Sequence, residues 1–139
     1  THIEILKSRK SVIQDRSIYE DVEIFALNLY KMGKMSKRDY DNYRNLFKEM
    51  TAFLKAPDLL LYLKSDLPKL QKQISLRGRD FEQNIDPGYL KNLNESYDEW
   101  ISRYNSGKCI VVDSNNLDFV NRKKDLKKIV NTIIDSIIK

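Results

Sequence analysis

The chain has 139 residues, a length that suits one domain with its own hydrophobic core. Hydrophobic residues make up 41% and charged residues 32%, with only four Gly and three Pro, so the composition excludes a disordered or fibrous protein. The net charge of +5 leaves two readings open, a polyanionic partner or a site for a small phosphorylated ligand.

The chain carries no signal for a membrane or for secretion. No uncharged apolar run approaches the roughly 20 residues that cross a bilayer, and the N-terminus lacks the pattern of a signal peptide. The single Cys109 cannot form an internal disulfide. These features predict a cytoplasmic protein with no membrane partner.

Three short apolar runs predict β-strands, at Ser11–Gln14, Leu59–Leu63 and Cys109–Val112. None of them alternates apolar with polar residues. Unbroken runs of this length are typical of strands that are covered on both faces in a parallel sheet.

Helical patterns separate these runs. The chain begins inside one (residues 3–10), and Ser36 with Asp39 indicates the start of another, which Pro57 ends. Asp86-Pro87 predicts the start of a helix that Ser106-Gly107 stops. The last helix has one continuous apolar face made by Leu126, Ile129, Val130, Ile133, Ile134, Ile137 and Ile138.

Alternating strands and helices predict a three-layer α/β fold with a parallel sheet. Three strands are few for so many helical faces, and no cap precedes the first helical pattern. We therefore expect a segment upstream of residue 1 in the complete protein.

Asp15-Arg16-Ser17 follows the first predicted strand directly. Ligands of open parallel sheets bind beyond the carboxyl ends of the strands, and an acid beside an Arg can bind Mg²⁺, accept a hydroxyl proton or hold a phosphate. The alternative is an ordinary helix start, where Asp and Ser are common caps. The spacing alone leaves both open.

A second charged group, Arg77-Gly78-Arg79 with Glu82, interrupts a helical pattern. Two Arg side chains match phosphate oxygens and could form a mobile clamp, although a solvated turn explains the same residues. The cluster formed by Lys123, Lys124, Lys127 and Lys128 reads as the solvated face of the last helix. No aromatic residues alternate with these lysines to stack bases.

In chain order, these motifs resemble the deoxynucleoside kinase family. The resemblance rests on Asp15 to Asp21 with Ile24-Phe25-Ala26, on Ala56 to Leu63, and on Leu76 to Arg79 followed by Glu82-Gln83, Tyr89-Leu90 and Trp100. It covers essentially the whole chain and is closest to bacterial kinases that act on deoxyadenosine and deoxyguanosine.

The resemblance implies a fold, a reaction and residue roles. The fold is the three-layer P-loop kinase fold, with a lid over about residues 73–85, and the reaction transfers the γ-phosphate of ATP to a deoxynucleoside 5′-hydroxyl with Mg²⁺. Asp15 is implied to bind Mg²⁺ and accept the proton, and Arg16 to reach the 5′-oxygen and the phosphate. The remaining implied contacts are Asp21 and Phe25 with the base, Glu82 with the sugar, Arg77 and Arg79 with the ATP phosphates, and Asp113, Asp118 and Phe119 with the adenine. Gln73 departs from relatives that place another lid Arg there.

The phosphate-binding loop Gly-x-x-x-x-Gly-Lys-Ser/Thr does not occur in the 139 residues, because no two of the glycines are five apart. We expect the chain to be the C-terminal portion of one kinase domain (residues 1–139), without the N-terminal strands and inactive alone. The complete enzyme is expected to be a homodimer that binds no nucleic acid. Two alternatives remain: a non-catalytic protein-interaction module, and a small basic nucleic-acid-binding protein.

Overall fold

The computed structural model describes residue 4, residues 11–82 and residues 85–138. His2, Gln83 and all of the expected first helix except Glu4 lie outside these ranges.

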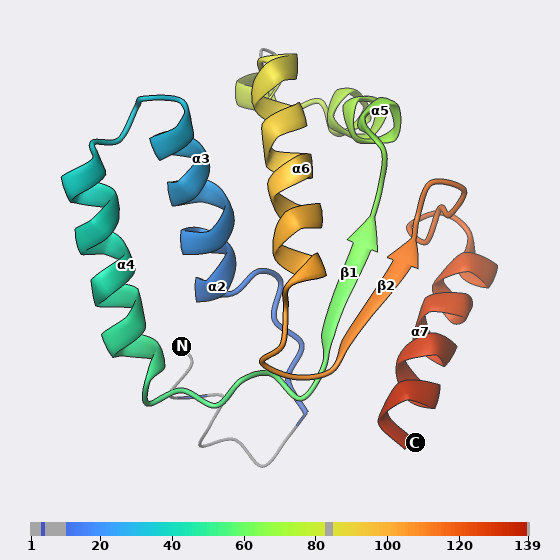
Figure 1. Cartoon of the computed structure of the whole chain (residues 1–139). Helices are drawn as coiled ribbons and strands as arrows, with labels where there is room; N and C mark the ends of the chain where they lie inside the picture. Colours follow the sequence, from blue (N-terminus) through green and yellow to red (C-terminus); the bar gives the residue numbers. More distant parts are fainter. Residues whose placement is uncertain (1–3, 5–10, 83–84, 139) are drawn as a thin grey trace.

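Two parallel strands form the sheet, β1 (Leu60–Lys64) and β2 (Cys109–Asp113). Leu60 pairs with Cys109 and Lys64 with Asp113, so the strands are in register along their whole length. Both match the predicted runs to within one residue. The crossover between them consists of α5 (Leu67–Arg77), the short 3₁₀ helix η2 (Asp80–Glu82) and α6 (Pro87–Ser102). In Figure 1, α6 and α7 (Lys123–Ile138) lie on opposite sides of the strands.

The predicted strand at residues 11–14 is wrong. These residues carry no regular secondary structure, and Val12 and Ile13 are 48% and 97% exposed. A β-strand exists through hydrogen bonds to a neighbouring strand, and the only strand pair within the described ranges is β1 with β2. The apolar run therefore has no paired strand among the described residues.

A nearly continuous helical rod follows, made of α2 (Ile18–Glu20), the π-helix η1 (Asp21–Ala26) and α3 (Leu27–Lys31). π-Helical turns are rare and frequently lie at functional sites. Helix α4 (Lys37–Thr51) comes next, and the predicted cap is confirmed, because the amide of Asp39 donates to the Ser36 hydroxyl at 3.1 Å. The helix ends at Thr51, well before Pro57.

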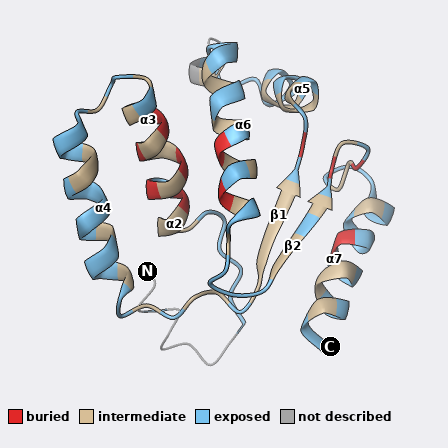
Figure 2. Cartoon of the chain, viewed as in Figure 1, coloured by how far each residue is buried: buried red, intermediate tan, exposed pale blue. Residues whose placement is uncertain are grey.

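The buried core lies where η1 and α3 pack against α6 (Figure 2). Its apolar members include Val22, Ile24, Ala26 and Trp100, each at most 6% exposed. The start of α6 is confirmed as predicted, with Pro87 in its first turn and the Gly88 amide donating to Asp86 Oδ1 at 3.1 Å. The core thus fixes η1 against α6, and with it the residues that precede η1.

Helix α7 carries the predicted apolar face, but the described chain covers only part of it. Ile129 is 6% exposed and buried, while five of its neighbours on the face are more than 40% exposed: Leu126, Val130, Ile134, Ile137 and Ile138. Among the described helices, none has the length and apolar character needed to cross a membrane.

Candidate active site

The segment Asp15–Arg16 forms an exposed loop directly before α2. Arg16 has a φ of 62°, the left-handed region that non-glycine residues rarely adopt. Its guanidinium carbon lies 5.1 Å from the centre of the Phe25 ring, within the range of a cation–π contact. The structure therefore brings together two of the predicted site residues, one from the loop and one from η1.

Glu20 stabilises this loop through hydrogen bonds to Ser17. It was not among the predicted site residues. It is 8% exposed, and its carboxylate accepts from the Ser17 amide at 2.8 Å and from the Ser17 hydroxyl. The Ser17 hydroxyl in turn accepts from the Tyr19 amide at 3.3 Å. This is a capping box, and the spacing Ser-x-x-Glu in the sequence was the signal that could have found it.

The carboxylates of Asp15 and Asp21 are exposed, and neither forms a hydrogen bond or an ion pair with another described residue. The negative charges of both carboxylates raise the pKa of Tyr97 in α6. Burial raises the pKa of the Tyr97 phenol, the negative charges of Glu20, Asp15 and Asp21 raise it further, and Arg16 opposes them. Tyr97 therefore lies within electrostatic reach of the loop.

Tyr97 is held by a network between β1 and α6. Its ring stacks on Tyr62, with centroids 5.9 Å apart and an interplanar angle of 9°. The Tyr62 hydroxyl donates to Asp98 Oδ1 at 3.1 Å, and Lys64 Nζ lies 2.7 Å from Asp98 Oδ2. Burial first, and then the Asp98 carboxylate, raise the pKa of Tyr62.

The second predicted group forms a compact ion cluster at the end of α5. Gly78 ends the helix with a φ of 64°, a conformation that glycine adopts without strain. Glu82 Oε1 accepts a hydrogen bond from Arg79 Nη1 at 3.1 Å and forms an ion pair with Arg77 Nη1 at 3.6 Å. The Arg side chains are about half exposed, whereas the Glu82 side chain is 13% exposed. Its Oε2 atom is buried without a hydrogen-bond partner among the described residues.

The third predicted group follows β2. Asp113 Oδ1 accepts from the Asn115 amide at 2.9 Å. Hydrogen bonds from the Asn121 side chain and backbone hold the pKa of Asp118 below its ordinary value. Phe119 is half-buried beside it. No hydrogen bond or ion pair within the described ranges joins these residues, the Asp15 loop and the Arg77–Glu82 cluster to one another.

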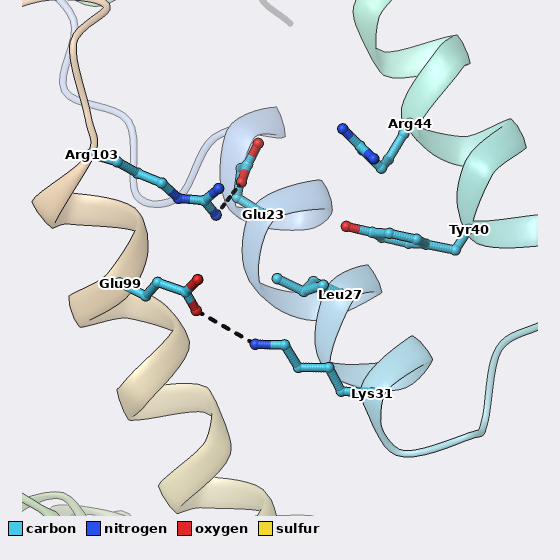
Figure 3. A pocket seen from close by; sticks show the side chains of 7 residues that line it. All are labelled: Glu23, Leu27, Lys31, Tyr40, Arg44, Glu99 and Arg103. Atoms are coloured by element: carbon cyan, nitrogen blue, oxygen red, sulfur yellow. Dashed lines mark hydrogen bonds and ion pairs between the residues drawn. The ribbon is translucent and has the colours of Figure 1, made fainter. Parts of the chain in front are cut away.

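A cavity of about 250 Å³ lies between η1–α3, α4 and α6 (Figure 3). Two ion pairs bridge its walls, Glu23–Arg103 at 2.9 Å and Lys31–Glu99 at 3.5 Å. Its lining residues are Glu23, Leu27, Lys31, Tyr40, Arg44, Glu99 and Arg103. None of these residues was predicted to belong to the site.

The deoxynucleoside kinase family model matches residues 1–139, the whole chain. The chain belongs to the deoxynucleoside kinase family. It is 35% identical over 131 residues to the deoxyadenosine/deoxycytidine kinase of Bacillus subtilis, which covers 93% of this chain and 60% of that protein. It is also 38% identical over 104 residues to the deoxyadenosine kinase of Dictyostelium discoideum, which covers 73% of this chain and 42% of that protein.

Solved structures of family members agree. The deoxyadenosine kinase from M. mycoides with dCMP and dCDP bound superposes with a TM-score of 0.78 at 27% identity, over 96% of this chain and 67% of that one. The same enzyme with bound dATP gives a TM-score of 0.74 at 25% identity. The resemblance and the α/β P-loop kinase fold are thus confirmed. The roles of individual residues in this deoxynucleoside kinase chain stay predictions.

Proposed function

We propose that this chain is the acceptor-binding and lid portion of a kinase that transfers the γ-phosphate of ATP to the 5′-hydroxyl of a deoxynucleoside. The family match over the whole chain carries the proposal. Relatives of the chain are named for deoxyadenosine, deoxyguanosine and deoxycytidine. Among these acceptors we expect the purine deoxynucleosides to be favoured.

The loop before α2 supports the acceptor role. The Asp15 carboxylate is exposed and has no partner among the described residues, so it is available to accept the proton of an incoming hydroxyl. Arg16 stands beside it and can place positive charge next to the oxygen that attacks. Phe25, beneath Arg16, offers a ring on which a base can pack, and Asp21 offers a carboxylate to its polar edge.

The Arg77–Glu82 cluster supports the lid role. Phosphoryl transfer needs positioning and neutralisation of charge on the phosphate oxygens, and two half-exposed guanidinium groups can supply both. Glu82 holds these groups through one oxygen, while its buried Oε2 is left to accept a hydrogen bond from the sugar 3′-hydroxyl.

Mg²⁺ is compatible with this chain, because that ion is usually held by one or two carboxylates together with phosphate oxygens, and Asp15 offers one such carboxylate. When bound, Mg²⁺ would neutralise charge on the ATP phosphates. Asp113, Asp118 and Phe119 would lie near the adenine of ATP.

The chain alone should not catalyse the reaction, since its 139 residues contain no phosphate-binding loop. It spans about 60% of the length of the Bacillus subtilis relative. We expect the complete enzyme to act in the cytoplasm. We also expect it to be a homodimer, and sedimentation of the purified protein would check its oligomeric state.

The exposed apolar face of α7 favours one other candidate, a non-catalytic module that binds a protein partner. Such a module has no reason to bind a nucleoside. A kinase-type site does, and ligand binding to the folded state raises stability by about 2.7 kcal/mol at a hundredfold excess over Kd.

Thermal unfolding with deoxyadenosine therefore tests the proposal. We expect deoxyadenosine to raise the Tm of the chain and uridine to leave it unchanged. Glu82→Gln should weaken deoxyadenosine binding about tenfold or more, since a hydrogen bond to a charged group contributes about 1.5–3 kcal/mol. Glu95→Gln, an exposed α6 residue paired with Lys91, is the matched control and should bind normally. A Tm that no deoxynucleoside raises would contradict the kinase proposal.

A further inference from the structure

The carboxyl ends of β1 and β2 lead into two segments that are bonded to each other. Ser65 follows β1 and Ser114 follows β2, and their hydroxyl oxygens lie 2.6 Å apart. They are 5% and 3% exposed. The Ser114 hydroxyl and amide also donate to the Lys64 carbonyl, at 2.9 and 2.8 Å. Because β1 and β2 are already joined by their own ladder, these bonds fix the segment beyond the sheet.

The bonds continue from Ser114 to the first turn of α5. Asn115 Oδ1 accepts from the Asp66 amide at 2.8 Å, and Asp66 is the N-cap of α5, where its carboxylate accepts from the Lys69 amide at 2.9 Å. Lys69 Nζ reaches back to the Leu117 carbonyl at 3.1 Å. The loop from Asp113 to Asp118 is thus tied to the start of α5 by both side chains and backbone.

Helix α5 carries the lid arginines at its other end. It has 11 residues, which at 1.5 Å per residue makes it about 16 Å long. Arg77 is its last residue, and Gly78 ends it. Where Arg77 stands relative to the Asp113–Asp118 loop therefore depends on how the first turn of α5 is held.

We propose that Ser114 and Asn115 are positioning residues that set the register between the nucleotide-facing loop at Asp113–Asp118 and the lid arginines, through α5. This inference rests on the proposed function, in which the loop faces the adenine of ATP and Arg77 its phosphates. One molecule of ATP must then contact both the Asp113–Asp118 loop and Arg77. The distance between this loop and Arg77 must therefore match the distance between the adenine and the phosphates of ATP. Asn115 acts through its acceptor oxygen and touches no reacting atom.

Spin labels can measure, in the full chain, the distance between the end of α5 and the residues that follow the Asp113–Asp118 loop. The labels are attached at Leu76→Cys and Val120→Cys, which are 76% and 82% exposed, in a Cys109→Ala background. We expect a narrow distance distribution in this parent. Asn115→Ala and Ser114→Ala should each broaden it, and Asn115→Asp should restore it, since aspartate keeps the acceptor oxygen for the Asp66 amide. Asn92→Ala, on exposed α6 surface, is the matched control.

Ligand binding gives a second readout that a purely structural role would not produce. Asn115→Ala should weaken ATP binding about three- to tenfold, the effect of one lost hydrogen bond, and leave deoxyadenosine binding unchanged, while Asn115→Asp recovers ATP binding. Unchanged distance distributions in both alanine variants would overturn the inference, even if the parent binds its ligands. A parent that binds neither ligand would contradict the proposed function, and the distance measurement would still decide the inference.

Discussion

At the scale of single residues, Arg16 joins a functional side chain to a strained backbone. A φ of 62° costs a non-glycine residue about 1 kcal/mol or more relative to glycine. Such strain persists where the surrounding structure holds it, and here the Ser17–Glu20 capping box and the Phe25 ring hold the loop on its downstream side. The conformation keeps the Arg16 guanidinium over η1, which is what the acceptor role requires.

This strain predicts opposite effects on stability and on binding. Arg16→Gly should be more stable than Arg16→Ala by about 1 kcal/mol, because only glycine adopts this conformation freely. Both variants lose the guanidinium, so both should bind deoxyadenosine more weakly than the parent. Urea unfolding, with ligand titrations on the same samples, measures the two effects. Equal stability of the two variants would show that the backbone at Arg16 is not strained.

Residues that act through contacts were the hardest to predict. The motifs whose order resembles the deoxynucleoside kinase family contain Asp15, Arg16, Arg77 and Glu82, so these residues could be predicted from the sequence. Ser65 and Ser114, by contrast, are 49 positions apart, and only the parallel register of the strands brings their hydroxyls together. Tyr97 reads as core from its helical spacing, and its place near the Asp15 loop follows from packing between α6 and η1.

At the scale of elements, local signals worked where the partner was also local. The Ser36 and Asp86 caps sit at their helix starts, since each bonds to an amide two or three residues away. The run at residues 11–14 contains the apolar residues Val12 and Ile13, but it has no paired strand beside it among the described residues. An apolar run predicts that a segment is suited to a sheet, whereas the neighbour that completes the strand is set by the rest of the fold.

The contact between β1 and α6 predicts a dependence of stability on alkaline pH. The pKa of Tyr62 is raised in the folded chain by burial and by Asp98, whereas the unfolded value is about 10. The folded state therefore holds this proton more tightly, so its contribution to stability is complete below pH 10 and falls as the pH rises above 10. Tyr62→Phe keeps the stack on Tyr97 and removes the titrating group.

Urea midpoints measured between pH 8 and pH 11 check this expectation. Stability of the parent should fall more steeply above pH 10 than stability of Tyr62→Phe, and the difference between the two isolates Tyr62 from the titrating lysines. Parallel curves for the two proteins would show that Tyr62 titrates as an ordinary exposed tyrosine.

At the scale of the whole molecule, the fold class followed from the order of several motifs. Two strands and the helices around them are too few to specify a P-loop kinase by periodicity. The order of the Asp15–Asp21, Ala56–Leu63 and Leu76–Glu82 motifs is specific, and the family match and the superposed structures confirm the fold that it implied. The exposed apolar residues of α7 could not be foreseen, because an amphipathic pattern does not say how much of the face is covered.

We propose that this chain contributes the acceptor and lid residues of a deoxynucleoside kinase, whereas its 139 residues contain no phosphate-binding loop. The most direct test is transfer of labelled γ-phosphate from ATP to deoxyadenosine. It is measured for the chain beginning at Thr1, alone and mixed with the part of the Bacillus subtilis relative that this chain does not match. We predict no product from the chain alone, 5′-phosphorylated product from the mixture, and loss of that product with Asp15→Asn. Turnover by the chain alone, or an active mixture that is indifferent to Asp15→Asn, would contradict the account.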